Sequence, residues 1–263
     1  MRVNQTLAKW RAGQKTVGGW LSLSNTHTAE KLAHAGFDWL CVDLQHGLLD
    51  YRDLLHMLPA ISTTQTTPFV RVSGNHASEI MKVLDAGAMG VIVPLVNDQS
   101  EAQAAVSACQ YPPEGTRSFG PTRAALYAGQ GYAAQANHEI ACIVMIETRA
   151  GIENLESIVA TPGLGGVFIG PADLGLALGL PPLGDTEAPE HVAAVSRILR
   201  VCKENNMPVG IYCSGREFAR KRLEMGFDFV SLNNDAGFMM QAVTRDLAAL
   251  RDAVPQVGEV TGY

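Results

Sequence analysis

The chain has 263 residues, of which 47% are hydrophobic and 17% charged, and its 20 Lys and Arg against 26 Asp and Glu give a formal charge of −6. This length suits one α/β barrel domain, a fold of about 250 residues, and we expect a single domain over 1–263. The slight acidity argues against a nucleic-acid groove and against a surface for anionic membranes. No apolar run approaches the ~18–20 residues of a membrane span, and the N-terminal segment lacks the apolar core of a secretory signal.

The cysteine pattern points to a reducing compartment. Five cysteines form an odd, scattered set without CxxC spacing, which argues against a disulfide framework and against a zinc site. We therefore expect a cytoplasmic protein. The cysteines are Cys41, Cys109, Cys142, Cys202 and Cys213.

Eight short runs rich in Val, Ile and Phe recur along the chain. Most are continuously apolar rather than alternating, which is typical of parallel strands buried on both faces. We expect strands at 17–23, 39–45, 68–72, 90–96, 140–147, 166–170, 208–213 and 227–232.

Helical patterns separate these runs, with clear examples at 76–87, 152–160 and 215–226. Gly36, Gly87 and Gly226 stand where helices favour a C-terminal glycine. Eight alternations of strand and helix predict a (β/α)8 barrel of the TIM type, with a doubly wound sheet as the structural alternative.

Two segments exceed what a minimal barrel needs. Residues 97–139 hold one expected helix, around 101–108, followed by a Pro-, Gly- and Arg-bearing loop at 111–132. Prolines and glycines also break the segment 178–191. Loops this long in a compact domain are usually functional or interfacial.

Two carboxylates follow consecutive strands at the end where a parallel barrel carries its active site. Glu147 ends the fifth strand and Asp173 follows the sixth, so their backbones would lie about 5 Å apart. Carboxylates that close repel each other unless a cation neutralises them, and oxygen ligands alone suit Mg²⁺ or Mn²⁺. The alternative is structural: Glu147 would pair with Arg149 or Arg71, and Asp173 would cap a helix.

The second and third strands end in further candidates. The second delivers Asp43, Gln45 and His46, and the third carries Arg71. A lone His is more often structural, but a carboxylate from Asp43 or Asp85 would raise its basicity. An unpaired guanidinium is costly to bury, so Arg71 must meet an anion: Glu147, Asp43, a substrate carboxylate or an enolate oxygen. The other histidines, His191 included, are expected to be solvated or capping residues.

The turn 170-GPAD-173 offers backbone N–H groups at the start of a helix, where a substrate carboxylate could bind. This signal is weak alone. The chain lacks the GxGxxG motif of dinucleotide sites and the P-loop motif.

Taken in order, these motifs resemble the class II pyruvate aldolases of the HpcH/HpaI aldolase and citrate lyase superfamily. The resemblance covers nearly the whole chain, and it is closest to the branch that uses pyruvate or hydroxypyruvate with varied aldehydes. It is carried by FDWLCVDLQHG, PFVRV, MKVLDAGAMGVIVPLV, YPPEGTRSFGPTR, MIETRAGIENLESI and GVFIGPADLGLALG.

The resemblance implies a metal-dependent TIM barrel that adds pyruvate-type enolates to aldehydes and reverses the reaction. It places His46 as the base, Asp85 as the residue that raises its basicity, and Arg71 as the stabiliser of the transition state. Glu147 and Asp173 would hold Mg²⁺ or Mn²⁺, with Co²⁺, Ni²⁺ or Zn²⁺ as further options. The 2-oxo acid would bind at Gly170, Pro171, Ala172 and Asp173.

The family also commonly assembles as hexamers, as trimers of dimers with an exchanged C-terminal helix, expected here near 236–253. Two departures bear on the substrate: Gln45 replaces the Glu that many members carry, and Met145 replaces a Gln found in members acting on long dicarboxylic ketols. Gln45 cannot serve as an acid or base, and Met145 cannot hydrogen-bond strongly to a polar substrate, so we expect both to affect specificity rather than enolisation.

Two rival functions remain open. An acyl-coenzyme A lyase of the citrate lyase or malyl-coenzyme A lyase type would need a basic surface for the nucleotide phosphates, and Arg117 with Arg123 is the only loop pair that could supply it. A barrel that binds an oxo acid without turning it over is the other. The absence of a lysine at the relevant strand ends argues against a Schiff-base aldolase.

Overall fold

The computed structural model describes residues 1–253, and residues 254–263 lie outside the described part. All eight predicted strands are present, in an order that closes β8 onto β1 with every neighbouring pair parallel. The predicted barrel is confirmed, and the doubly wound alternative is wrong. The strands are β1 (Thr16–Leu21), β2 (Trp39–Asp43), β3 (Thr67–Arg71), β4 (Gly90–Val93), β5 (Ala141–Ile146), β6 (Gly166–Ile169), β7 (Val209–Cys213) and β8 (Phe229–Asn234).

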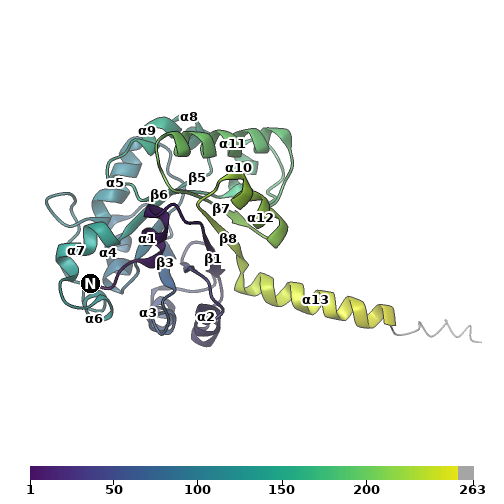
Figure 1. Ribbon diagram of the computed structural model, residues 1–263, viewed down its shortest axis with the longest axis horizontal. Coiled ribbons are helices and arrows are strands. Elements are labelled where there is room, and N and C mark those ends of the chain that lie inside the picture. Colours follow the sequence, from purple (N-terminus) through teal and green to yellow (C-terminus); the bar gives the residue numbers. More distant parts are fainter. Residues whose placement is uncertain (254–263) are drawn as a thin grey trace, which may run out of the picture.

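Helices surround the barrel, as Figure 1 shows. None of the helices within residues 1–253 combines the length and hydropathy that crossing a bilayer requires. The helices are α1 (Gln5–Arg11), α2 (Thr26–Ala33), α3 (Tyr51–Ile61), α4 (Ala77–Asp85), α5 (Gln99–Cys109), α6 (Ala124–Ala128), α7 (Tyr132–Glu139), α8 (Arg149–Glu153), α9 (Leu155–Val159), α10 (Pro171–Ala177), α11 (Pro189–Glu204), α12 (Arg216–Met225) and α13 (Asp235–Ala253).

Local chemistry explains where the helices depart from expectation. The helix expected at 152–160 is two short helices, α8 and α9, separated at Asn154, whose amide donates to the carbonyl of Asn97 at 2.9 Å. The expected loop 111–132 contains α6, and Gly129 and Gly131 at φ of +84° and +81° separate it from α7. Glycine adopts such left-handed angles without the strain that a Cβ would cause.

Aromatic side chains fill the barrel interior from end to end. Trp10 of α1 enters at the amino ends of the strands and stacks on Phe229 with ring centroids 4.3 Å apart. Trp39 lies against Phe69 in the middle, and Trp20 stacks on Phe168 toward the carboxyl ends. Stacked aromatic pairs add about 0.5–1.5 kcal/mol each beyond the burial of apolar area. The packed interior therefore leaves room for a site only at the strand ends.

The last helix, α13, runs away from the barrel instead of packing along it (Figure 1). Residues spaced three or four apart along it expose apolar side chains: Met240, Val243, Leu247 and Leu250 are 45–63% exposed. An apolar stripe at helical spacing normally faces another element. The helix expected near 236–253 is confirmed, while its exchange between subunits stays a prediction. Residues 254–263 of the expected single domain lie outside the described residues.

The barrel interior depends on a small residue at Gly18. A Cβ built there would lie 2.0 Å from the ring of Trp39. We expect Gly18→Ala to lower the free energy of unfolding by about 1–3 kcal/mol, because overpacking forces the buried ring to move. Urea titration followed by circular dichroism measures this. Gly184→Ala is the control, since nothing lies within 4 Å of its added Cβ; equal stability of both variants would contradict the packing argument.

Candidate active site

A cavity of about 350 Å³ opens where the strands end at their carboxyl side. Residues in or just after β1, β2, β3, β5, β6, β7 and β8 line it, because parallel strands of a closed barrel converge at this edge. Most of the predicted site residues meet here: His46, Arg71, Gly170, Pro171, Ala172 and Asp173.

Asp43 and Arg71 form a buried, two-pronged ion pair at the floor of this cavity. Arg71 donates from Nε to Oδ1 of Asp43 at 2.8 Å and from Nη2 to Oδ2 at 2.6 Å. Burial opposes ionisation of Asp43, but the hydrogen bonds and the charge of Arg71 lower the pKa of its carboxyl below the usual value. Of the anions open to Arg71, Asp43 is the protein partner. Arg71 also lies beneath Trp20, 5.1 Å from the ring centroid.

The same aspartate shapes the turn that carries His46. Oδ1 of Asp43 accepts the N–H of Gln45 at 3.1 Å and of His46 at 3.2 Å. Gly47 makes the turn possible, because a Cβ there would lie 2.3 Å from the carbonyl oxygen of Asp43. The His46 side chain is exposed at the rim of the cavity, so a substrate can reach it. Asp43 thus has a structural role, and among residues 1–253 no side chain hydrogen-bonds the imidazole of His46.

Glu147 is buried behind Gly170, next to the cavity but not among the residues that line it, and it forms no ion pair among the described residues. Its side chain is 2% exposed; Oε1 accepts the N–H of Leu95 at 2.9 Å, and Oε2 has no partner within residues 1–253. Burial raises the pKa of Glu147 to about 7, opposed by the Leu95 N–H and reinforced by the charge of Asp173. The structural alternatives are wrong: Arg71 pairs with Asp43, and Arg149 donates to the Ala177 carbonyl.

Asp173 lies in the first turn of α10, together with the backbone N–H groups expected to bind the substrate carboxylate, here called the oxo-acid seat. The helix begins at Pro171 with Gly170 as its N-cap residue, so Asp173 does not cap it, contrary to the structural alternative. Only glycine fits at position 170 without a clash, because a Cβ there would lie 2.0 Å from Oε2 of Glu147. The absence of a side chain lets the Glu147 carboxylate reach the start of α10, where the first N–H groups are free of helical partners.

Asp85 lies elsewhere in the chain's own barrel. It ends α4, close to where β4 begins, and the N–H of the nearby Met89 donates to Pro68 at the amino end of β3. Its carboxylate accepts from Nη2 of the fully buried Arg117 at 2.8 Å. Asp85 does not line the cavity with His46. Within one chain the predicted pair is therefore not formed.

The cavity also has lining residues that the sequence does not predict, and three of them carry polar groups on large or amide side chains. They are Trp20 near the end of β1, Tyr212 of β7 and Asn234 of β8. Burial raises the pKa of Tyr212 to about 12, so its hydroxyl stays protonated and can donate. The predicted strands contain Trp20 and Tyr212 but end two residues before Asn234, and strand patterns alone do not tell which side chains point inward.

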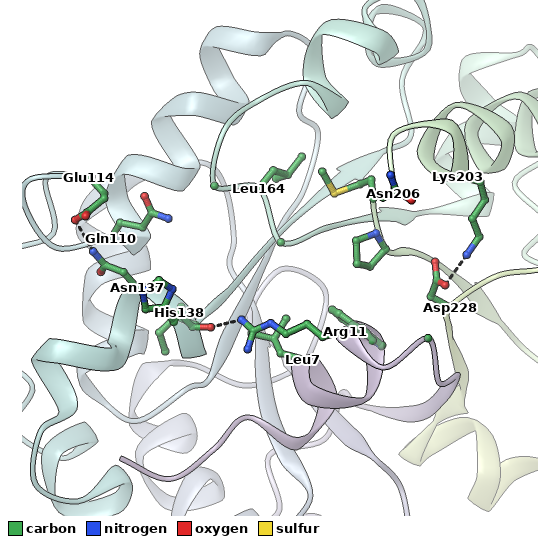
Figure 2. A pocket seen from close by; sticks show the side chains of 17 residues that line it. Leu7, Arg11, Gln110, Glu114, Asn137, His138, Leu164, Lys203, Asn206 and Asp228 are labelled. Atoms are coloured by element: carbon green, nitrogen blue, oxygen red, sulfur yellow. Dashed lines mark hydrogen bonds and ion pairs between the residues drawn. The ribbon is translucent and has the colours of Figure 1, made fainter.

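A larger cavity, of about 700 Å³, lies at the opposite end of the barrel (Figure 2). Its charged groups are engaged with one another: Lys203 pairs with Asp228, Arg11 donates to the carbonyl of His138, and Asn137 donates to Glu114. None of the predicted site residues lines it. Active sites of TIM barrels lie at the other face, so size alone does not make this the site.

Comparison with known proteins decides the family. The family model described as HpcH/HpaI aldolase/citrate lyase matches residues 16–242. The chain belongs to the HpcH/HpaI aldolase/citrate lyase family. Its sequence is 42% identical over 249 residues to the hydroxypyruvate/pyruvate aldolase of Rhizorhabdus wittichii, covering 95% of this chain and 99% of the relative. It is 39% identical to the 2-dehydro-3,6-dideoxy-6-sulfogluconate aldolase of Pseudomonas putida, over 94% and 97% of the two chains.

Solved structures agree. A HpcH/HpaI aldolase/citrate lyase family protein from Burkholderia cenocepacia superimposes with a TM-score of 0.88 at 33% identity, covering 95% of this chain and all of the other. Relatives this similar over the full length make this HpcH/HpaI family member an aldolase, a carbon–carbon lyase. The family consists of metal-dependent aldolases.

The donor set here fits a hard divalent cation. Glu147 presents a buried oxygen without a partner among the described residues, and Asp173 lies near enough to raise its pKa. A cation beside them would replace the bound proton and cancel the repulsion. No group of three or more His, Cys, Asp or Glu side chains in residues 1–253 could hold a metal, so two carboxylates would leave open positions for substrate.

The raised pKa of Glu147 makes a prediction about metal affinity. A cation needs the carboxylate, and below a pKa of about 7 a proton occupies it. The apparent affinity for Mn²⁺ should fall by about tenfold per pH unit below 7 and level off above it. Electron paramagnetic resonance titrations of Mn²⁺ between pH 5.5 and about 8.5 measure this. A constant affinity across that range would contradict the assignment.

The same shift has a consequence for the metal-free protein. Because the pKa is raised in the folded state, the stabilisation that Glu147 contributes is complete below pH 4.5, the ordinary value, and is lost as the pH rises through about 7. Glu147→Gln should therefore be more stable than the metal-free parent at pH ~8, while losing stabilisation by Mn²⁺. Thermal unfolding with and without Mn²⁺ separates these two effects.

The contact at Gly170 gives a second prediction. Gly170→Ala should lower metal affinity by about tenfold or more, because the new methyl group occupies the place of Glu147 Oε2. The backbone at φ −89° accepts alanine, so the circular dichroism spectrum should not change. Gly184→Ala, at the same cavity but with nothing within 4 Å of its Cβ, is the matched control. Unchanged Mn²⁺ binding in Gly170→Ala would refute this account of the glycine.

Proposed function

We propose that this protein is a metal-dependent class II aldolase that joins pyruvate or hydroxypyruvate to an aldehyde and reverses that reaction. The observation that carries the proposal is the buried Oε2 of Glu147, which has no partner among residues 1–253 and lies near Asp173 and the free N–H groups of α10. A cation and a 2-oxo acid would satisfy these groups together. The name of the Rhizorhabdus wittichii relative, at 42% identity, supports the same donor substrates.

In this proposal Glu147 and Asp173 hold the cation, Mg²⁺ or Mn²⁺ first, with Co²⁺, Ni²⁺ or Zn²⁺ as options. When bound, the cation supplies Lewis-acid polarisation of the 2-oxo group, which acidifies the neighbouring C–H. The N–H groups of Ala172 and Asp173 receive the substrate carboxylate at the start of α10. Arg71, held in place by Asp43, keeps a positive charge at the floor while negative charge develops on the enolate oxygen.

His46 moves the proton. It is exposed at the rim, so it can take a proton from the C3 carbon of the oxo acid in synthesis and from the 4-hydroxyl in cleavage, directly or through one water. Within one chain Asp85 is engaged with Arg117 at the other end of the barrel. The carboxylate that supports His46 would then be Asp85 of a neighbouring copy, which makes assembly part of catalysis.

We propose a homo-oligomer, a trimer of dimers, with α13 exchanged between subunits. The exposed apolar stripe of Met240, Val243, Leu247 and Leu250 supports this, because an apolar stripe at helical spacing normally faces another element. All five cysteines are free and buried, in keeping with the expected cytoplasmic location. Small-molecule oxo acids and aldehydes are the expected partners, with no nucleic acid and no membrane.

Two residues separate this protein from relatives with other substrates. Gln45 lies at the turn beside His46, and its Oε1 is buried without a partner among residues 1–253. Met145 lines the cavity with an apolar side chain. Neither can bind a distal carboxylate of a long substrate by charge, so we propose short, uncharged aldehydes as acceptors.

The coenzyme A lyase alternative finds no support in the structure. It would need Arg117 and Arg123 free at the surface, but Arg117 is fully buried and paired with Asp85. Arg123 donates to the Ala86 carbonyl and to Oγ of Ser62. Two arginines whose guanidinium groups already hydrogen-bond protein acceptors cannot also bind nucleotide phosphates.

Exchange of the methyl protons of pyruvate tests the proposal. In D2O with Mg²⁺ or Mn²⁺, we expect deuterium uptake by ¹H NMR that stops with a chelator and falls by at least about a hundredfold in Glu147→Ala. Glu156→Ala, at an exposed carboxylate far from the cavity, is the control. Binding of pyruvate without exchange would instead identify the non-catalytic oxo-acid barrel.

A further inference from the structure

His191 lies in the first turn of α11 and is completely buried, with 0% of its surface exposed. The expectation that it is solvated or a cap is wrong. Buried histidines normally have partners at both ring nitrogens. Here Nε2 lies 2.9 Å from the carbonyl oxygen of Pro171, while Nδ1 has no partner within residues 1–253. A packing role alone would be filled by an apolar side chain without an unpaired nitrogen.

The geometry assigns a direction to this hydrogen bond. A carbonyl oxygen can only accept, so Nε2–H of His191 donates to Pro171. The acceptor belongs to the first residue of α10, which begins the turn proposed to bind the oxo acid. The contact therefore joins the first turn of α11 to the substrate end of α10, although the two residues are 20 positions apart.

The hydrogen bond of His191 affects the cavity through the peptide unit that joins Pro171 to Ala172. The Pro171 carbonyl and the Ala172 N–H belong to one planar, trans peptide unit, in which they point in opposite directions. Holding the oxygen thus sets the direction of the N–H. Ala172 lines the cavity, whereas His191 is buried behind it. By donating to the Pro171 carbonyl from the buried side, His191 consequently points the Ala172 N–H toward the cavity.

We propose that His191 is a positioning residue for the oxo-acid seat: by donating to Pro171 it orients the Ala172 N–H toward the substrate carboxylate. This rests on the proposed function, because the seat is part of it. Pro171 has no N–H of its own, so Ala172 supplies the first one of the helix. An N–H turned away from the carboxylate would leave that charge poorly bound.

Two variants of similar size separate donation from packing. In His191→Gln the amide can donate to Pro171, and in His191→Met a side chain of nearly the same shape cannot. We expect His191→Met to raise the dissociation constant of pyruvate in the presence of Mg²⁺ by about tenfold or more, and His191→Gln to stay within about threefold of the parent. Isothermal titration calorimetry measures both.

Direct Mn²⁺ binding supplies a readout that does not depend on turnover. The Mn²⁺ dissociation constant should change less than the pyruvate constant in His191→Met, because the hydrogen bond orients a backbone N–H and not the carboxylate of Glu147. Equal pyruvate affinities in the two variants would overturn the proposal. So would equal losses of pyruvate and Mn²⁺ affinity, which would indicate general damage to packing.

The parent protein offers a test without any variant, which decides the case if His191→Met does not fold. ¹⁵N NMR of histidine-labelled protein should show His191 with the proton on Nε2 and none on Nδ1, and its Nε2–H signal should shift when pyruvate and Mg²⁺ bind. A proton on Nδ1 alone, or a signal unmoved by pyruvate, would refute the assignment. If the parent does not bind pyruvate at all, the proposed function fails, whereas normal binding by all variants removes only the role of His191.

Discussion

The two-pronged ion pair between Arg71 and Asp43 sets the distribution of charge over the floor of the cavity. It engages both prongs of Arg71, so the buried Glu147 forms no ion pair among residues 1–253 and accepts there only the N–H of Leu95. Burial then raises the pKa of Glu147. A floor built this way favours a divalent cation, since only an added positive charge stabilises both Glu147 and Asp173 as carboxylates. The same Asp43 also shapes the turn of His46.

Much of this could be predicted from the sequence, for reasons of pattern. Strands buried on both faces require continuous apolar runs, and these placed all eight strands to within a few residues. The carboxyl ends of such strands converge, so polar residues that follow them, such as His46 and Asp173, meet in one cavity. Periodicity and convergence are properties of the chain alone, and they need no knowledge of partners.

The rest depends on contacts that sequence patterns do not describe. His191 is polar and sits in a helix, which normally indicates solvent, yet α11 packs it against the start of α10. Asp85 was placed with His46, but a helix that follows a parallel strand ends at the opposite face of the barrel, where Arg117 holds it. The segment around Arg117 is predicted as a loop. The Arg117 guanidinium lies 4.5 Å from the ring centroid of Tyr111 and 5.4 Å from that of Tyr132. This packing holds the segment in place.

These placements divide the proposed chemistry into two parts of different origin. Each chain builds the floor by itself: Glu147, Asp173, Arg71 and the start of α10 are held by contacts within one barrel. The proton-transferring part is different, because His46 is exposed at the rim and no carboxylate among residues 1–253 hydrogen-bonds its ring. An imidazole without such a partner is a weaker base and is less firmly oriented. In the proposed mechanism the single barrel would bind the oxo acid, while efficient enolisation would come with assembly, which the exposed apolar stripe on α13 favours.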